Sequence, residues 1–147
     1  MSDKNKVYLI GSLRNPTITG LSNVLEEQLP VEAFSSWVAA GPEADDYWKQ
    51  YESERGRSYV EALQGYAAQH VFKFDKHHLD TSDAAILVYP AGKSGHLELG
   101  YMAGRGKPTV ILLDQDYDRW DVMLAFAGCV TYSWDEAISY LKEELGL

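Results

Sequence analysis

Glu98 is the only carboxylate within residues 94–104, SGHLELGYMAG, and its position raises the question of what a charge does there. A predicted buried strand precedes this stretch, and Ser94 is placed to cap a helix that begins at about Gly95. Glu98 then falls in the first turn, where the helix N-terminus favours an ionised carboxylate. Such a carboxylate can act as a nucleophile. The alternative is that Glu98 is only a favourable first-turn residue.

Two further side chains are candidates to work with Glu98. Asp75 lies in FKFDKHHLD near the end of a predicted helix, where an acid beside aromatic residues is suited to protonate a leaving group. Tyr8 lies in the first predicted strand, where its hydroxyl could reach a carboxylate across the sheet end or its ring could simply fill the core. Two carboxylates with separate roles are the groups that cleave a glycosidic bond through an oxocarbenium-like state.

The elements that position these residues alternate along the chain. Strand patterns cover residues 6–11, 83–89, 108–113, 129–133 and, more weakly, 31–37. Helical patterns cover residues 19–29, 58–80, 96–105 and 135–145. Continuous apolar runs are typical of parallel strands buried on both faces. The sequence therefore predicts one α/β domain over residues 1–147, with a doubly wound, five-stranded parallel sheet of flavodoxin-like or Rossmann-like type.

The helix at residues 96–105 should pack closely on this sheet. Apolar and small residues recur at spacings of three, four and seven, which predicts a buried face of Leu97, Gly100, Tyr101 and Gly104. Glu98 is expected beside that face.

Two turns lie where an open parallel sheet binds ligands, beyond the carboxyl ends of its strands. Gly11, Ser12 and Arg14 follow the first strand and offer backbone N–H groups, a hydroxyl and a guanidinium to an oxyanion. Gly92 and Ser94 lie in the glycine-rich turn after the strand at 83–89. The first turn lacks the spacing of a phosphate-binding P-loop or a dinucleotide fingerprint, and a plain turn is the alternative.

Composition narrows the classes of partner. The chain has 13 Lys plus Arg against 22 Asp plus Glu, a formal charge of -9, which disfavours a nucleic acid polymer and still allows a small anion. One cysteine, Cys129, excludes a disulfide framework. The four histidines lack a ligand spacing and are interpreted as surface or supporting residues, so we expect no metal and no cofactor. No run is apolar enough for a signal peptide or a membrane span, which leads us to expect a cytoplasmic protein.

An acidic segment rich in aromatic residues, residues 39–57, interrupts the alternation. It is interpreted as a loop with a short helix that covers a site, or equally as a solvated surface excursion. Trp37, Tyr47 and Trp48 would stack on a ligand base if they face the cleft, and pack within the covering segment if they do not.

These motifs resemble the nucleoside 2-deoxyribosyltransferase superfamily, which includes the 2'-deoxynucleoside 5'-phosphate N-hydrolases. The likeness extends from residue 6 to about residue 145, and its strongest part is SGHLELGYMAGRGKPTVILL, residues 94–113. It implies that Glu98 attacks the anomeric carbon of the sugar and forms a glycosyl-enzyme. It also implies that Tyr8, in VYLIGS, orients the glutamate and that Asp75 contacts the base and helps it to leave.

The resemblance also implies a homodimer or larger homo-oligomer. Residues 121–125, DVMLA, are similar to a segment that reaches the sugar 5' end in a neighbouring subunit. Asp121 there suits a free 5'-hydroxyl and would repel a phosphate. The turn Gly11-Ser12-Leu13-Arg14, in contrast, is similar to the Gly-Ser-Ile-Arg turn that holds a 5'-phosphate in the nucleotide hydrolases, so the two features indicate different substrates.

The expected function is cleavage of the N-glycosidic bond of a nucleoside 5'-monophosphate or a nucleoside. Water as acceptor makes a hydrolase, and a second base makes a transferase. Residues 91–94, AGKS, lack the aspartate that the transferases tend to carry before the nucleophile. The alternatives are a non-catalytic protein that binds or senses a nucleotide, and a structural subunit with Trp120 and Asp121 at an interface.

Overall fold

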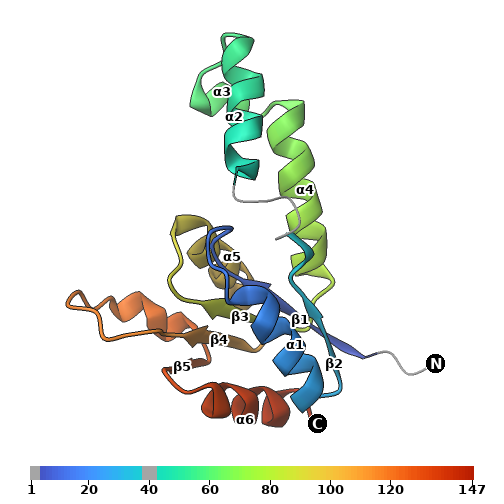
Figure 1. Ribbon diagram of the computed structural model, residues 1–147, viewed down its shortest axis with the longest axis vertical. Helices are drawn as coiled ribbons and strands as arrows, with labels where there is room; N and C mark the ends of the chain where they lie inside the picture. The colour runs from blue at the N-terminus through green and yellow to red at the C-terminus, as the bar shows by residue number, and fades with distance from the viewer. Residues whose placement is uncertain (1–3, 38–42) are drawn as a thin grey trace.

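In the part of the chain that the structure describes, five parallel strands form the centre of the molecule (Figure 1). The computed structural model describes residues 4–37 and 43–147. The strands are β1 (Asn5–Ile10), β2 (Val31–Phe34), β3 (Ala84–Val88), β4 (Thr109–Leu112) and β5 (Cys129–Thr131). They pair in the order β2-β1-β3-β4-β5, the flavodoxin-like order. The predicted doubly wound α/β fold is therefore confirmed.

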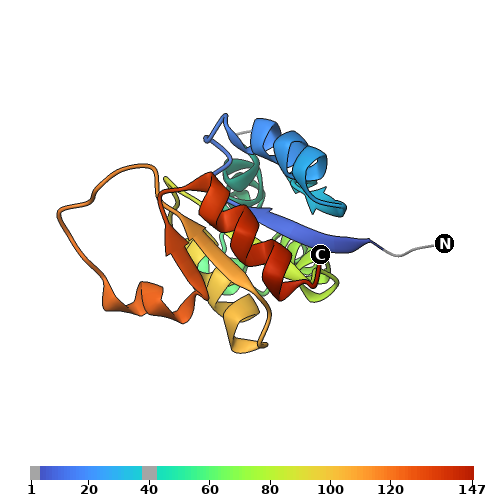
Figure 2. The same cartoon turned by 90° about the horizontal axis from the view of Figure 1, so that it is seen from below.

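Helices cover both faces of the sheet because alternate side chains of its strands point to opposite sides. Val7 and Leu9 of β1 pack in one core with α1 (Ile18–Gln28) and α6 (Trp134–Glu144), and α6 crosses the sheet on this face (Figure 2). Tyr8 and Ile10 pack in a second core with α5 (Lys93–Gly104) and the C-terminal end of α4 (Tyr66–Asp80). Tyr8 therefore lies on the same face of the sheet as Glu98 and Asp75.

A helical arm projects from this α/β body (Figure 1). It consists of α2 (Ala44–Glu54), α3 (Tyr59–Ala62) and the N-terminal half of α4. The acidic segment predicted as a loop with a short helix thus contains a helix of 11 residues, α2. Residues 39–42 of that segment lie outside the described residues.

The prediction of a single helix over residues 58–80 is wrong, because this region forms two helices, α3 and α4. Gly65 is the N-cap of α4, and a Cβ atom on it would lie 2.4 Å from Oε1 of Glu52. Glu52 is 1% exposed and forms an ion pair with Arg57. The interruption between α3 and α4 therefore lets the tip of the arm pack around the carboxylate of Glu52, which belongs to a different helix, α2.

The remaining elements differ from expectation only in detail. The strands predicted over 31–37 and 129–133 end at Phe34 and Thr131, and a 3-10 helix, η2 (Val122–Phe126), precedes β5. None of the helices in the described part of the chain combines the length and the apolar character that crossing a bilayer requires.

Candidate functional site

A cavity of about 470 Å³ opens at the carboxyl ends of β1 and β3. Its walls come from the turns after β1 and β2, from α4 and from the start of α5. Of the residues singled out in the sequence, nine line it: Tyr8, Gly11, Ser12, Arg14, Trp37, Asp75, Gly92, Ser94 and Glu98. Trp48 and Asp121 do not line it.

The start of α5 differs from the prediction. Gly92, with extended backbone angles, is the N-cap, and the helix begins at Lys93, so Ser94 does not cap it. Glu98 is consequently the sixth residue of the helix and lies in its second turn. The helix N-terminus therefore stabilises the ionised form of Glu98 less than it would stabilise a carboxylate in the first turn.

The buried face of α5 also differs from the prediction. The buried residues are Gly95, Leu99 and Met102, whereas Leu97 is 76% exposed. Gly95 is the point of close approach, since a Cβ atom on it would lie 2.8 Å from Cδ1 of Leu87 in β3. Glu98, three residues after Gly95 and four before Met102, thus lies on the face that meets the sheet, and its carboxylate reaches the cavity.

Burial dominates the protonation of Glu98. It raises the pKa of the carboxyl to about 7; the negative charge of Asp75 acts in the same direction, and a hydrogen bond with Tyr8 lowers the pKa. Within the described residues, Oε2 of Glu98 is buried and has no hydrogen-bond partner. One oxygen of the carboxylate is therefore available to a ligand atom in the cavity.

Tyr8 both fills the core with its ring and reaches a carboxylate with its hydroxyl, the two alternatives that the sequence leaves open. Its ring is 2% exposed and packs against Phe34 at a centroid distance of 5.2 Å, while its hydroxyl hydrogen-bonds the Glu98 carboxylate. Burial, followed by the charges of Glu98 and Asp75, raises the pKa of the Tyr8 phenol, so the hydroxyl remains a donor at all ordinary pH values.

Asp75 lies on α4 and faces the cavity together with Glu98. Its charge raises the pKa values of both Glu98 and Tyr8, which means that the three side chains interact electrostatically.

The turn after β1 is held by hydrogen bonds of its own. Oγ of Ser12 accepts from the backbone N–H of Arg14 at 3.1 Å, and Oδ1 of Asn15 accepts from the backbone N–H of Thr17 at 3.0 Å. Arg14 and Lys93, from the two turns, both line the cavity and bring positive charge to it. An anionic group of a ligand would find cations and a rigid backbone here.

Of the three aromatic residues suggested for stacking on a base, only Trp37 lines the cavity. The indole of Trp37 donates to the backbone oxygen of Leu9 at 2.7 Å and lines the cavity, so it is both an anchor and a wall. Tyr47 and Trp48 line a separate groove between α2 and α4. Asp121 lies in a small hollow between α5 and η2, where its side chain caps η2 through the backbone N–H of Met123 at 2.9 Å.

Sequence reasoning missed part of the α4 wall. His70, Val71 and Phe74 line the cavity beside Asp75, so His70 belongs to the site and not only to the surface. The signal lies in the helical spacing, because positions 71 and 75 share one face of α4. No group of three or more His, Cys, Asp or Glu in residues 4–37 and 43–147 is arranged to hold a metal ion; that none is needed stays a prediction.

His96 supports the other wall of the cavity. Its Nδ1 contacts the backbone oxygen of Gly92 at 2.7 Å and its Nε2 contacts the hydroxyl of Tyr89 at 2.6 Å. Because a carbonyl oxygen only accepts, Nδ1 of His96 is the donor in the bond to Gly92. These two bonds fix the turn that carries Gly92, Lys93 and Ser94.

Comparison with known proteins bears on the fold. No protein-family model and no curated protein sequence matches the chain. Among solved structures, the chain is similar to the 2-deoxyribosyltransferase of the psychrotolerant bacterium Bacillus psychrosaccharolyticus, with a TM-score of 0.62 and 17% sequence identity. The similarity covers 92% of this chain and 91% of that one. The α/β body and the arrangement of its elements thus follow a fold that a 2-deoxyribosyltransferase also has.

Proposed function

We propose that the protein cleaves the N-glycosidic bond of a nucleoside 5'-monophosphate or a nucleoside. The observation that supports this most strongly is the group of Glu98, Tyr8 and Asp75 in one cavity at the carboxyl end of the sheet. Two carboxyl groups with different surroundings are suited to a nucleophile and an acid. The shared fold with a 2-deoxyribosyltransferase is consistent with this chemistry.

In the first step, the ionised carboxylate of Glu98 forms a bond to the anomeric carbon while the bond from that carbon to the base nitrogen breaks. The electron pair of the broken bond goes to the base, which Asp75 stabilises by giving it a proton. Tyr8 holds the Glu98 carboxylate in position through its hydrogen bond.

In the second step, an acceptor replaces Glu98 on the sugar. If water attacks, Asp75 takes a proton from it, Glu98 leaves as a carboxylate, and the enzyme is a hydrolase. If a second base attacks, the enzyme is a transferase. We favour water, because residues 91–94 lack the additional aspartate that the transferases tend to carry.

The positive side of the cavity favours a 5'-monophosphate over a free nucleoside. Arg14 and Lys93 both line the cavity, and the hydroxyl of Ser12 is in the same wall. A phosphate there would make charge-assisted hydrogen bonds. Asp121, which would oppose a phosphate, lies outside the cavity of its own chain and would act on a ligand only from a neighbouring subunit.

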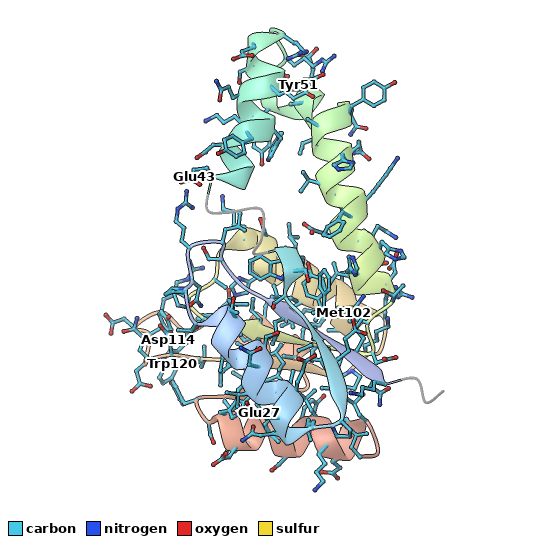
Figure 3. The ribbon with its side chains drawn as sticks, turned by 45° about the vertical axis from the view of Figure 1, so that its right-hand side comes forward. Glu27, Glu43, Tyr51, Met102, Asp114 and Trp120 are labelled. Atoms are coloured by element: carbon cyan, nitrogen blue, oxygen red, sulfur yellow. The ribbon has the colours of Figure 1, made fainter. Side chains whose placement is uncertain are left out.

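We also infer a homo-oligomer in which the segment around Asp121 approaches the neighbour's site. The segment exposes large apolar side chains: Trp120 is 92%, Val122 78% and Phe126 73% exposed. Trp120 lies at an edge of the body well away from the arm (Figure 3). An apolar patch of this kind is typical of a surface that a partner covers.

The proposal is tested by chromatography of free base released from ribo- and deoxyribonucleosides and their 5'-monophosphates, with and without an acceptor base. We expect base release without acceptor, abolished in Glu98→Ala, with a circular dichroism spectrum unchanged by the mutation. Glu27→Ala, which removes an exposed carboxylate of α1, is the matched control and should retain activity. Release only with acceptor would make the protein a transferase. Tight binding of a nucleotide without any release would identify a binding protein and contradict the proposal.

The role of Arg14 has its own test within the same panel. Arg14→Ala should raise KM for monophosphates more than for nucleosides. Equal effects on both substrate classes would rule out a phosphate contact.

A further inference from the structure

A second hollow, of about 780 Å³, lies along the helical arm beside the cavity. We call it the arm groove. Tyr47, Trp48 and Tyr51 of α2 form one side, and Tyr66, Ala67 and Val71 of α4 form the other. Most of this lining is aromatic or aliphatic, and it is accessible, since Tyr47 is 63% and Tyr66 88% exposed.

The arm groove and the cavity share a wall. His70 and Val71 line both hollows. Asp75, Val71 and Ala67 are spaced by four residues and lie on one face of α4, which carries them over about 12 Å of helix from the cavity into the groove. A leaving group held at Asp75 would therefore have the arm groove directly beyond it.

The two sides of the groove are held together at the tip of the arm. Glu52 of α2 is 1% exposed, ion pairs with Arg57 and packs against Gly65, the N-cap of α4, where a Cβ atom would come within 2.4 Å of it. The aromatic walls are thus preformed, which lowers the entropic cost of binding a ligand between them.

We propose that the arm groove binds an apolar substituent on the base of the substrate. This rests on the proposed function and names its substrate class: N-glycosides whose base carries a bulky aliphatic or aromatic group. The base itself is held in the cavity at Asp75, and its substituent passes Val71 and lies between the aromatic rings of α2 and α4. Burial of that group and of the exposed rings supplies the binding energy.

The test measures affinity without turnover. Calorimetry on the Glu98→Ala protein compares 2'-deoxyadenosine 5'-monophosphate with the derivative that carries a benzyl group on the exocyclic amine, and repeats the comparison for the cytosine nucleotide. We expect at least one benzyl compound to bind about tenfold or more tightly than its parent, as burial of part of one ring predicts. In wild-type protein, kcat/KM for base release should show the same preference.

Two variants locate the effect. Ala67→Trp fills the arm groove and should remove the difference in affinity between benzyl compound and parent. Lys49→Trp places the same ring on α2 at an exposed position that does not line the groove, and should leave the difference intact.

Equal affinities for both members of each pair, no binding of either benzyl compound, or a preference that survives Ala67→Trp would overturn the proposal. Equal affinities together with a change of oligomeric state in Ala67→Trp would mean that a second copy of the chain covers the groove, which overturns it as well. Failure of the proposed function is distinct, because wild-type protein would then release no base while the affinities still decide what the groove binds.

Discussion

In the proposed mechanism Glu98 must be ionised to attack the sugar, yet its surroundings oppose ionisation. Burial and Asp75 raise its pKa to about 7, and the Tyr8 hydroxyl counteracts them. Near neutral pH the Glu98 carboxyl is therefore only partly ionised. Glu98, the proposed nucleophile, therefore carries no permanent charge, so the core does not have to hold a fixed buried charge.

This balance predicts the pH dependence of base release. The rate should rise as the pH passes through about 7, because Glu98 loses its proton there. Tyr8→Phe removes the hydrogen bond that lowers the pKa of Glu98, so the rising limb should move to higher pH. Single-turnover rates from about pH 5 to about pH 9 check both. Tyr132→Phe, which alters an exposed tyrosine bonded to Asp116, should leave the limb in place; a limb unmoved in Tyr8→Phe would contradict the role of Tyr8.

His96 gives a second prediction at the residue scale. His96→Leu removes the bonds to Gly92 and Tyr89 and should lower kcat/KM about tenfold, because the turn that lines the cavity loses its fixed position. His96→Asn retains a donor near the Gly92 carbonyl and should restore part of the loss. Steady-state kinetics on the two variants decides this. Identical losses in both would show that the bond to Gly92 does not position the turn.

Among the elements, α5 shows how far sequence patterns carry and where they fail. The glycine-rich turn and the apolar spacing correctly predict that a helix exists here and that it carries Glu98. The predicted buried face is wrong, because Leu97 and Tyr101 are apolar and yet exposed, while Gly95 has no side chain to reveal that it packs on β3. The spacing of apolar side chains cannot reveal this contact, because the residue of α5 that approaches β3 most closely is a glycine, Gly95.

Two glycines of α5 should respond oppositely to the same substitution. Gly95→Ala places a Cβ atom 2.8 Å from Leu87, in the buried core, and should lower the free energy of unfolding by about 1–3 kcal/mol through overpacking. A Cβ atom on Gly100 would meet nothing within 4 Å, so Gly100→Ala should raise the free energy of unfolding by about 0.5–1 kcal/mol through helix propensity. Urea denaturation of both variants tests the packing of α5. A stabilising Gly95→Ala would contradict the close approach.

The sheet and the arm differ in how well the sequence predicts them. Strands β1, β3 and β4 contain continuous apolar runs, and β3 is buried at every residue, so local pattern and final structure agree there. The arm depends on a contact between Glu52 and Gly65, residues of different helices, and the helix break it requires has no strong local signal. From the sequence alone, Gly65 could be either a glycine tolerated inside a long helix or the N-cap of a new helix.

At the scale of the whole molecule, the candidate site is largely predictable because parallel strands bring their carboxyl ends together. Tyr8, Asp75 and Glu98 come from three different elements, and nine of the residues expected at the site line one cavity. Trp48 and Asp121 fall outside it because the arm holds Trp48 away from the sheet and the loop before β5 carries Asp121 to the far side of α5.

The exposed apolar patch near Asp121 predicts the state of association. Sedimentation should detect a dimer or larger homo-oligomer, and Phe126→Asp, at a side chain that is 73% exposed, should dissociate it and reduce base release. Leu147→Asp alters another exposed apolar residue, at the C-terminus, and should preserve the oligomer. A monomeric wild-type protein with full activity would contradict a neighbour's contribution to the site.

The most direct measurement is mass spectrometry of the covalent glycosyl-enzyme. Tryptic cleavage after Lys93 and Arg105 yields the peptide of residues 94–105, SGHLELGYMAGR, in which Glu98 is the only side-chain carboxylate. Protein quenched in acid during turnover of a 2'-deoxynucleoside 5'-monophosphate should carry the mass of the sugar phosphate on this peptide, and Glu98→Ala should carry none. Base release by the wild-type protein without any adduct on residues 94–105 would contradict nucleophilic attack by Glu98.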